Sequence, residues 1–318
     1  MDLIDRKILC ELDMDCRQPV SKIAKSLRIG RNVADYRIKN LENKGIIRKY
    51  ICSVNLGLLG YRTYKIYFKI KNKKDSEKEF VNNLIKNKKV IHFLKTEGPF
   101  DYSATIAVKT IYELDFFLMD LKNEFRDLIT DYFVSIIVYS KVFKLNKLLL
   151  NEKKRVLKSE KYSGEEKEIK IDKKDIKILR ELSQSADISL VDLAYRTKLT
   201  LDVVKYRLKL LEKKLINSYR IIFDMNKLGY YHYAFMLRIK QTTKSEEEKL
   251  VSWCASKKNV LYCTKRIGYF DFSINAAIAD LSGLNNFILE LKSEFGDMID
   301  SYETMVNAEL IKLDYMPF

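Results

Sequence analysis

The chain has 318 residues, of which 47% are hydrophobic, so it is long enough to bury more than one core. Its 59 Lys and Arg residues outnumber its 43 Asp and Glu residues, and the net charge of +16 favours polyanionic partners, although a lysine-rich proteome makes basic proteins of every function. No stretch approaches the roughly 20 apolar residues that span a bilayer, and the five scattered cysteines form no close pair. We therefore expect a cytoplasmic protein that has no membrane contact, cofactor or metal.

The first 55 residues predict a winged helix-turn-helix. Apolar residues recur at helical spacing over 3–14 and 20–27, and again from the break at 28–30 to about Lys44, where Gly45 stops the third helix. Val33, Ile38 and Leu41 are expected to face the core. Residues 47–55 are expected to form an extended hairpin. Helix, helix, short turn, helix and hairpin is the order of elements in this domain.

Residues 56–150 change to a different pattern. Strands are predicted over 61–70, 90–96, 101–108 and 132–142, and helices over 77–86 and 114–125. The order β-α-β-β-α-β is that of a ferredoxin-like domain.

Residues 151–170 are charged and are expected to form a solvated linker, helical at its start and broken near Ser163 and Gly164. The whole pattern then recurs about 170 residues later, with a second winged helix-turn-helix over 171–225 and a second ferredoxin-like domain over 226–318. The clearest match pairs VADYRIKNLE at 33–42 with VVKYRLKLLE at 203–212. The fold class is therefore α+β, with one unit present twice.

The third helix of a winged helix-turn-helix enters the major groove, where its outward side chains contact bases and phosphates. Arg31 and Asn32 are of the types that make bidentate contacts to guanine and adenine edges, whereas a phosphate needs only positive charge. On a lone helix these charges would form only a solvated face; the three-helix setting favours DNA contact. The candidates in the first copy are Arg28, Arg31, Asn32, Asp35, Tyr36 and Lys39, with Arg48 and Lys49 in the wing.

The corresponding helix of the second copy has lost the Arg-Asn pair, and Asp202 stands where the first copy has Asn32. A carboxylate accepts from a cytosine amine but repels phosphates, so weaker or differently specific binding is expected. The alternative is that this helix has drifted into a structural role. Its outward set is Leu201, Asp202, Lys205, Tyr206 and Lys209, with Arg196, Lys198 and Lys213 nearby; the DNA-contact candidates among these residues are Lys198, Asp202, Lys205, Tyr206 and Lys209.

Gly98 and Asp101 recur as Gly268 and Asp271. Turn chemistry explains a glycine and an aspartate before a strand, and spacing alone favours that interpretation. The functional alternative is a loop that holds the charged ends of an amino acid. His92 and His232 do not align between the copies and are interpreted as satisfied structural side chains.

Each copy resembles members of the leucine-responsive regulator (Lrp/AsnC) family. The resemblance rests on IDRKIL at 4–9, SKIA at 21–24, the segment 33–46 and GPFDY at 98–102, and on 174–179, 192–194, 206–212 and 268–272 in the second copy. It implies effector domains that pair through their sheets as a dimeric α/β barrel, higher homo-oligomers, and in many members a free amino acid bound near the Gly-x-x-Asp turn. The chain departs from the family in carrying two copies, and in having Gly30 where Ser or Thr is usual and Leu215 where Gly is usual.

The resemblance implies a transcription regulator that is not an enzyme. Its two linked copies would form a pseudo-dimer on double-stranded DNA, with an amino acid or other small metabolite as effector. The enzymatic alternative is a siroheme decarboxylase, a class that looks like paired Lrp/AsnC units without DNA binding. That class should have histidines and arginines facing a porphyrin pocket, and a less basic third helix. A metabolite sensor that binds DNA weakly is a third alternative.

Overall fold

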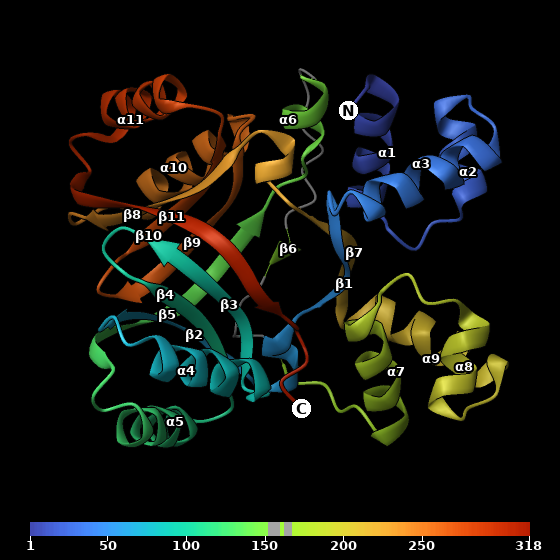
Figure 1. Ribbon diagram of the computed structural model, residues 1–318, viewed down its shortest axis with the longest axis horizontal. Helices are drawn as coiled ribbons and strands as arrows, with labels where there is room; N and C mark the ends of the chain where they lie inside the picture. Colours follow the sequence, from blue (N-terminus) through green and yellow to red (C-terminus); the bar gives the residue numbers. More distant parts are fainter. Residues whose placement is uncertain (152–159, 162–166) are drawn as a thin grey trace.

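The computed structural model describes residues 1–151, 160–161 and 167–318. Figure 1 shows a barrel of strands flanked by helices on its left and two small helical domains on its right. Each helical domain consists of three helices, as the sequence predicts, and one strand. These elements are α1 (Leu3–Met14), α2 (Val20–Leu27), α3 (Arg31–Asn43) and β1 (Ile47–Val54), and in the second copy α7 (Lys173–Gln184), α8 (Leu190–Thr197), α9 (Leu201–Lys214) and β7 (Ile216–Phe223).

The expected hairpin over 47–55 is wrong. This segment forms the single strand β1, which pairs antiparallel with β7 of the other copy, so that Tyr50 lies opposite Ile221. Residues 47–54 (IRKYICSV) contain no glycine, proline or asparagine that could make a tight turn. The strand therefore finds its partner in the other copy.

Backbone hydrogen bonds extend this pairing in matched positions. The Cys16 amide donates to the Tyr219 carbonyl, and the Ala186 amide donates to the Tyr50 carbonyl. Both winged helix-turn-helix domains also contribute to one continuous hydrophobic core, which includes Ile8 and Leu179. The two domains are consequently held to each other by a shared sheet and a shared core.

Each copy then forms the predicted β-α-β-β-α-β unit, preceded by a short 3-10 helix. In the first copy the elements are η1 (Leu56–Leu59), β2 (Arg62–Ile70), α4 (Lys74–Lys86), β3 (Val90–Glu97), β4 (Tyr102–Val108), α5 (Ile111–Glu124) and β5 (Ile129–Val142), followed by α6 (Asn146–Leu150). In the second copy they are η2 (Asn226–Leu228), β8 (Tyr231–Ile239), α10 (Lys244–Ser256), β9 (Val260–Gly268), β10 (Phe272–Ile278), α11 (Leu281–Phe295) and β11 (Ile299–Leu313).

The strands of the two copies join into one sheet of order β2-β4-β3-β11-β8-β10-β9-β5-β6, and β2 also pairs with β5. The sheet therefore closes on itself as a barrel, with two seams between the copies, β3 with β11 and β5 with β9. Alternate residues of each strand face outward under the helices or inward. On β2, for example, Ile66 and Phe68 lie in the outer core with Phe80 of α4, whereas Lys65 and Tyr67 face the interior.

The expected helical start of the linker and its break near Ser163 and Gly164 lie outside the described residues; within 151–170, β6 (Glu160–Lys161) pairs with β5. The five cysteines are buried, and none of them forms a disulfide bond. In the described part of the chain, no helix is long and apolar enough to cross a membrane.

Candidate nucleic-acid interface and a cavity inside the barrel

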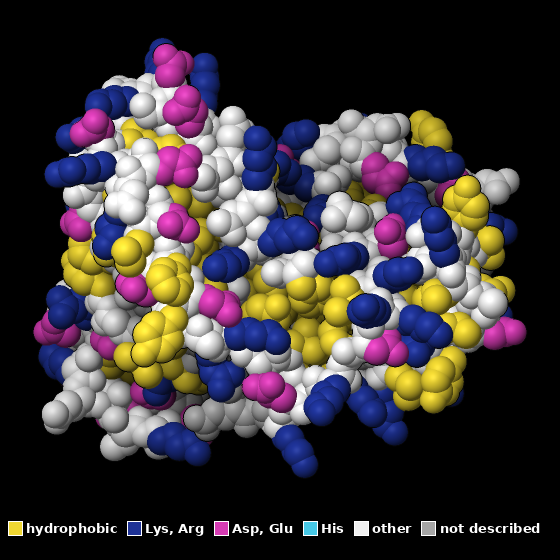
Figure 2. Space-filling view, turned by 90° about the horizontal axis from the view of Figure 1, so that it is seen from below, with side chains coloured by type: hydrophobic (Ala, Val, Ile, Leu, Met, Phe, Trp, Pro, Cys, Tyr) yellow, Lys and Arg dark blue, Asp and Glu magenta, His cyan; other side chains and the backbone are white. Residues whose placement is uncertain are grey.

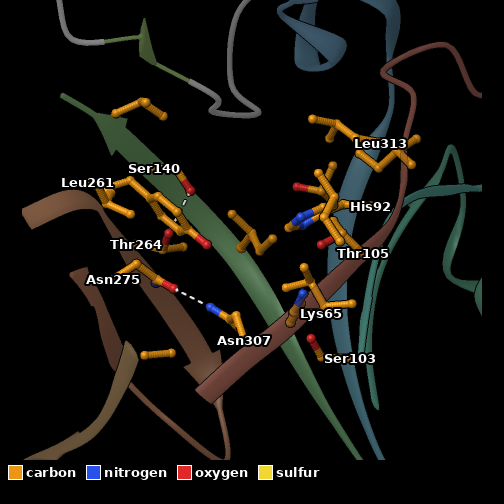
Figure 3. Close-up of a pocket in the computed structure, with 18 of the residues that line it drawn as sticks. Lys65, His92, Ser103, Thr105, Ser140, Leu261, Thr264, Asn275, Asn307 and Leu313 are labelled. Carbon is orange, nitrogen blue, oxygen red and sulfur yellow. Dashed lines mark hydrogen bonds between the residues drawn. The ribbon is translucent and has the colours of Figure 1, made fainter. Parts of the chain in front are cut away.

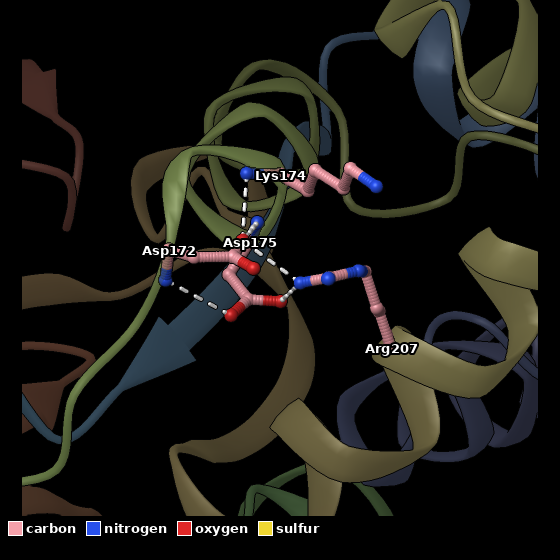
Figure 4. Close-up of polar contacts among 4 residues, drawn as sticks. All are labelled: Asp172, Lys174, Asp175 and Arg207. Atoms are coloured by element: carbon pink, nitrogen blue, oxygen red, sulfur yellow. Dashed lines mark hydrogen bonds and ion pairs between the residues drawn. The ribbon is translucent and has the colours of Figure 1, made fainter.

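A repeated ion-pair cluster fixes each recognition helix, α3 and α9, to the start of its domain. Arg37 on α3 donates to Asp2 at 2.7 Å and to Asp5 at 2.8 Å. Arg207 on α9 makes the same contacts to Asp172 at 2.8 Å and Asp175 at 2.9 Å (Figure 4). The same aspartates cap the first helix of each domain, because they accept from backbone amides there.

Hydrogen bonds explain the charge state of this cluster. The backbone amide of Asp5 and then the Arg37 guanidinium lower the pKa of Asp2, and the Asp175 amide does the same for Asp172. The sequence pattern did not single out these arginines, although both the arginine and its two aspartates recur at the repeat spacing. Arg37 and Arg207 hold the recognition helices against the first helix of their domains through these contacts.

On α3 the candidates Arg31, Asn32 and Lys39 are exposed, Tyr36 is 70% exposed, and Asp35 is partly exposed. Val33, which we expected in the core, is 46% exposed, so that expectation is wrong. Ala34 takes its place with Ile38 and Leu41, because the spacing 34, 38, 41 follows one helix face. The outward face therefore also includes Val33.

The remaining charges of the first copy have specific contacts. Lys39 pairs with Asp35 at 2.9 Å on the exposed face, which raises the pKa of Lys39. Arg48 donates to the Leu310 carbonyl at 3.3 Å and Lys49 to the Leu313 carbonyl at 2.8 Å. These two wing residues thus contact the end of β11, a contact that local sequence could not indicate. Arg28 lies exposed in the turn before α3, with a left-handed φ of 55°.

The second recognition helix differs in its cap and in its face. The Thr200 hydroxyl accepts from the Val203 amide at 3.4 Å, whereas Gly30, at the equivalent position, gives α3 no side-chain cap. Its polar candidates are exposed: Lys198, Asp202, Lys205, Tyr206 and Lys209. Figure 2 shows Lys and Arg side chains spread over this side of the molecule, including its right-hand part, where the second winged helix-turn-helix domain lies.

The Gly-x-x-Asp turns are engaged in the fold. The Asp101 carboxylate accepts from the Ile70 amide and the Asp271 carboxylate from the Ile239 amide, each at 2.8 Å. Gly98 and Gly268 have φ of 122° and 135° and lie against the backbone of the neighbouring copy at the two seams. These contacts accord with turn chemistry, and the cavity described next is lined by other residues.

A cavity of about 300 Å³ lies inside the barrel, between the two copies. In Figure 3, Lys65 and His92 extend from one side and Asn275 and Thr264 from the other, with Asn307 between them. The β1–β7 ribbon contributes to its wall through Ile51 and the segment 220–223. Within the described part of the chain, its lining contains no Asp or Glu.

The two histidines belong to this cavity. His232 donates from Nε2 to the side-chain oxygen Oδ1 of Asn275 at 3.2 Å, and the same oxygen accepts from Asn307 Nδ2 at 3.1 Å. The His92 side chain lines the cavity and forms no hydrogen bond with the described residues, so its interpretation as a satisfied structural side chain stays a prediction. Burial lowers the pKa of His232 to about 4 and that of His92 well below its usual value.

Three cationic side chains of the lining are buried or nearly so. Arg220 of β7 pairs at 2.8 Å with the buried Asp13 of α1, so that a residue of one copy neutralises a residue of the other. Arg266 donates to the Ser273 hydroxyl through Nε and Nη2, whereas its Nη1 has no hydrogen-bond partner in the described structure. Lys65 is 6% exposed, and burial together with the Arg266 charge lowers its pKa well below the usual value.

Comparison with known proteins matches the helical domain of each copy. A family model described as winged helix-turn-helix DNA-binding matches residues 1–48 and 171–214. The HTH-type transcriptional regulator FL11 of Pyrococcus abyssi is 33% identical over 118 residues, which are 37% of this chain and 78% of that protein. The HTH-type transcriptional regulator Ptr1 of Methanocaldococcus jannaschii is 29% identical over 120 residues, or 38% of this chain and 80% of its own.

Among solved structures, the siroheme decarboxylase NirDL is similar in fold to the whole chain. Its crystal structure has a TM-score of 0.64 and 16% identity, and the match covers 100% of this chain and 94% of NirDL. At that identity the likeness concerns the fold alone. The match to FL11 is closer in sequence and includes 78% of that regulator. On this match, and on the winged helix-turn-helix in both copies, the chain belongs to the Lrp/AsnC family of transcription regulators.

Proposed function

We propose that this protein is a DNA-binding transcription regulator whose two copies act as a pseudo-dimer within one chain. The observation that carries the proposal is the antiparallel pairing of β1 with β7. Each of these strands directly follows a recognition helix, so the ribbon holds α3 and α9 on one body. A two-fold pair of such helices suits half-sites about 34 Å apart, one turn of DNA.

The two recognition helices differ in chemistry, and this supports an asymmetric binding site. Arg31 and Asn32 offer bidentate donors to base edges, whereas Leu201 and Asp202 offer an apolar side chain and a carboxylate. The second helix then binds a different half-site or contributes mainly phosphate contacts through Lys205 and Lys209.

Two substitutions on α3 test the groove assignment. Arg31→Ala should relax base preference at one half-site, and Lys39→Ala should weaken all DNA equally and reduce the salt slope by about one unit. Binding is measured by fluorescence anisotropy on specific and scrambled duplexes at several salt concentrations. Lys78→Ala, which removes an exposed charge on α4, serves as the control. The assignment fails if Arg31→Ala and Lys39→Ala behave as the control does.

A small metabolite, such as an amino acid, is proposed to modulate this binding. The Gly-x-x-Asp turns at Gly98 and Asp101 and at Gly268 and Asp271 are the positions that the family resemblance indicates. The measurement is DNA affinity with and without each of the amino acids. Effector binding at these turns is contradicted if no amino acid changes the affinity, or if Asp101→Asn and Asp271→Asn leave the response intact.

Assembly into a homo-oligomer through the ferredoxin-like domains is also proposed. Tyr112, Phe116 and Met119 are 72%, 59% and 45% exposed along one face of α5. Figure 2 shows hydrophobic side chains on its left-hand part, where α5 lies. Phe116→Lys should lower the mass measured by light scattering, and an unchanged mass would place any self-contact elsewhere.

A siroheme decarboxylase-like activity is the second candidate. One observation favours it: His92, His232 and Arg266 meet in a cavity of a chain whose whole fold is similar to NirDL. The basic recognition helices fit a regulator better, and a cavity of about 300 Å³ lies at the lower end of small-molecule pockets. Titration with siroheme decides the matter, since a Soret shift with loss of carboxylate groups would establish the enzyme.

A further inference from the structure

Two buried cations face the barrel cavity without an acidic partner. Lys65 and Arg266 are each 6% exposed, and within the described residues Lys65 has no hydrogen-bond or ion-pair partner. Arg266 has only a neutral hydroxyl, that of Ser273, on two of its nitrogens. Arg220, in contrast, forms an ion pair with the Asp13 carboxylate. Burying a cation without a counter-charge is costly, so such groups mark a place where an anion belongs.

The duplication shows that the fold does not require these cations. Strand register makes Ala234 the counterpart of Lys65, because Lys65 lies opposite Thr105 and Ala234 lies opposite Asn275, the counterpart of Thr105. Thr96 is the counterpart of Arg266, since each donates its amide to the carbonyl of the turn aspartate, Asp101 or Asp271. A small neutral residue therefore fits each position.

Two further polar positions of the cavity also differ between the copies. Register makes Tyr262 the counterpart of His92, and Thr105 that of Asn275. A homodimer would repeat every group across its two-fold axis, which passes through such a cavity. Two linked copies are free to differ, and here they differ at the residues that line one shared space. The result is a single asymmetric site, suited to one ligand in one orientation.

We propose that this cavity binds a small organic carboxylate, with its anionic head between Lys65 and Arg266 and its apolar body against Met236, Met305 and Leu261. Charge-assisted bonds from a lysine and an arginine are the strongest that a carboxylate receives in a dry site. Asn275, Asn307 and His232 supply neutral polar contacts on the opposite side. The described lining has no carboxylate for an ammonium group, so an oxo acid fits this chemistry and a zwitterionic amino acid does not.

The cavity wall connects this site to the recognition helices. Arg220, Ile221 and Phe223 line it from β7, which directly follows α9. Arg220 is bonded to Asp13 of α1, and Ile51 lines the cavity from β1, which directly follows α3. A ligand that contacts the ribbon can therefore change the positions of both recognition helices, α3 and α9. The effect of the ligand on DNA binding rests on the proposed function. The binding of a carboxylate in the cavity does not.

The test uses the full-length protein and three matched probes: phenylpyruvate, phenylalanine and phenylacetamide. Binding is followed by thermal shift and by isothermal titration without DNA. Phenylpyruvate should raise the melting temperature by several degrees at saturation, whereas the amino acid and the neutral amide should not. Lys65→Met and Arg266→Thr should each weaken its binding at least about tenfold, and Lys69→Met, on the exposed face of β2, should not change it.

A second measurement separates a binding role from a structural one. Without ligand, Lys65→Met should melt at a higher temperature than the wild type, because it replaces a buried basic group that has no partner among the described residues by an apolar side chain. The proposal is overturned if phenylpyruvate gives no shift, if phenylalanine or inorganic phosphate shifts as strongly, or if Lys65→Met binds unchanged and melts lower. If phenylpyruvate binds but the protein does not bind DNA, the proposed function fails and the carboxylate site remains.

Discussion

His92 and His232 extend into the barrel interior, where burial lowers the pKa of both. An unfolded histidine has a pKa near 6.5, and that of His232 in the fold is about 4. Between these values the unfolded chain binds more protons than the folded one, so the folded state loses stability as the pH falls from about 6.5 toward 4.

The free energy of unfolding should therefore fall by up to about 1.4 kcal/mol per pH unit for each of these histidines. Urea unfolding at several pH values between 7 and 4 measures this slope. His232→Gln should make the slope shallower by up to one such increment, relative to the wild type. An identical slope in the variant would show that His232 is protonated, or exposed, in the folded protein.

Asp13 and Arg220 form an ion pair that is nearly inaccessible to solvent, with side chains 1% and 11% exposed. Asp13→Asn removes the carboxylate that faces the guanidinium, and should lower the free energy of unfolding by about 3 kcal/mol. Asp35→Asn breaks an exposed pair and should cost less than about 1 kcal/mol. Equal losses in chemical denaturation would contradict the interior position of the first pair.

The close packing of strands at the two seams between the copies depends on glycine. A Cβ at Gly268 would lie 2.7 Å from the Val134 carbonyl oxygen of β5, and one at Gly98 would lie 3.1 Å from that of Thr304 on β11. Both residues also have positive φ. Each seam requires glycine for two reasons. The turn needs a positive φ, and the backbone of the other copy leaves no room for a Cβ.

Gly268→Ala should consequently destabilise the protein by about 3 kcal/mol or more, through steric overlap added to backbone strain. Gly229→Ala is the matched control, since Gly229 has φ 83° but no atom within 4 Å of the added Cβ. The control should cost only about 1–2 kcal/mol. Similar melting temperatures for the two variants would refute the close approach at the seam.

The helices and strands could be predicted from the sequence because their patterns are local: a period near 3.6 or of 2, and stops such as Gly45. The partner of β1 could not, since nothing within 47–54 indicates a strand about 170 residues away. The cavity was missed for the same reason. One signal was available: Lys65 lies at an inward position of a strand whose opposite face carries Tyr64, Ile66 and Phe68.

For the whole molecule, the duplication has kept the residues that build the fold and changed those that face outward or into the cavity. Arg37 and Arg207 hold equivalent aspartates, and Gly98 and Gly268 lie at equivalent seams. Asn32 and Asp202 differ at the start of the recognition helices, as Lys65 and Ala234 differ in the barrel. The copies are paired in architecture, and the proposed function makes them unequal partners on DNA.

Selection of bound sequences from a random DNA pool, followed by footprinting of the selected site, tests most directly whether the two recognition helices bind unlike half-sites. Two unlike half-sites about one helical turn apart are expected, with stronger base-specific protection on the half bound by α3. Arg31→Ala should relax the base preference at that half alone. A perfect palindrome with equal protection of both halves, or a pool that shows no enrichment, would contradict the account.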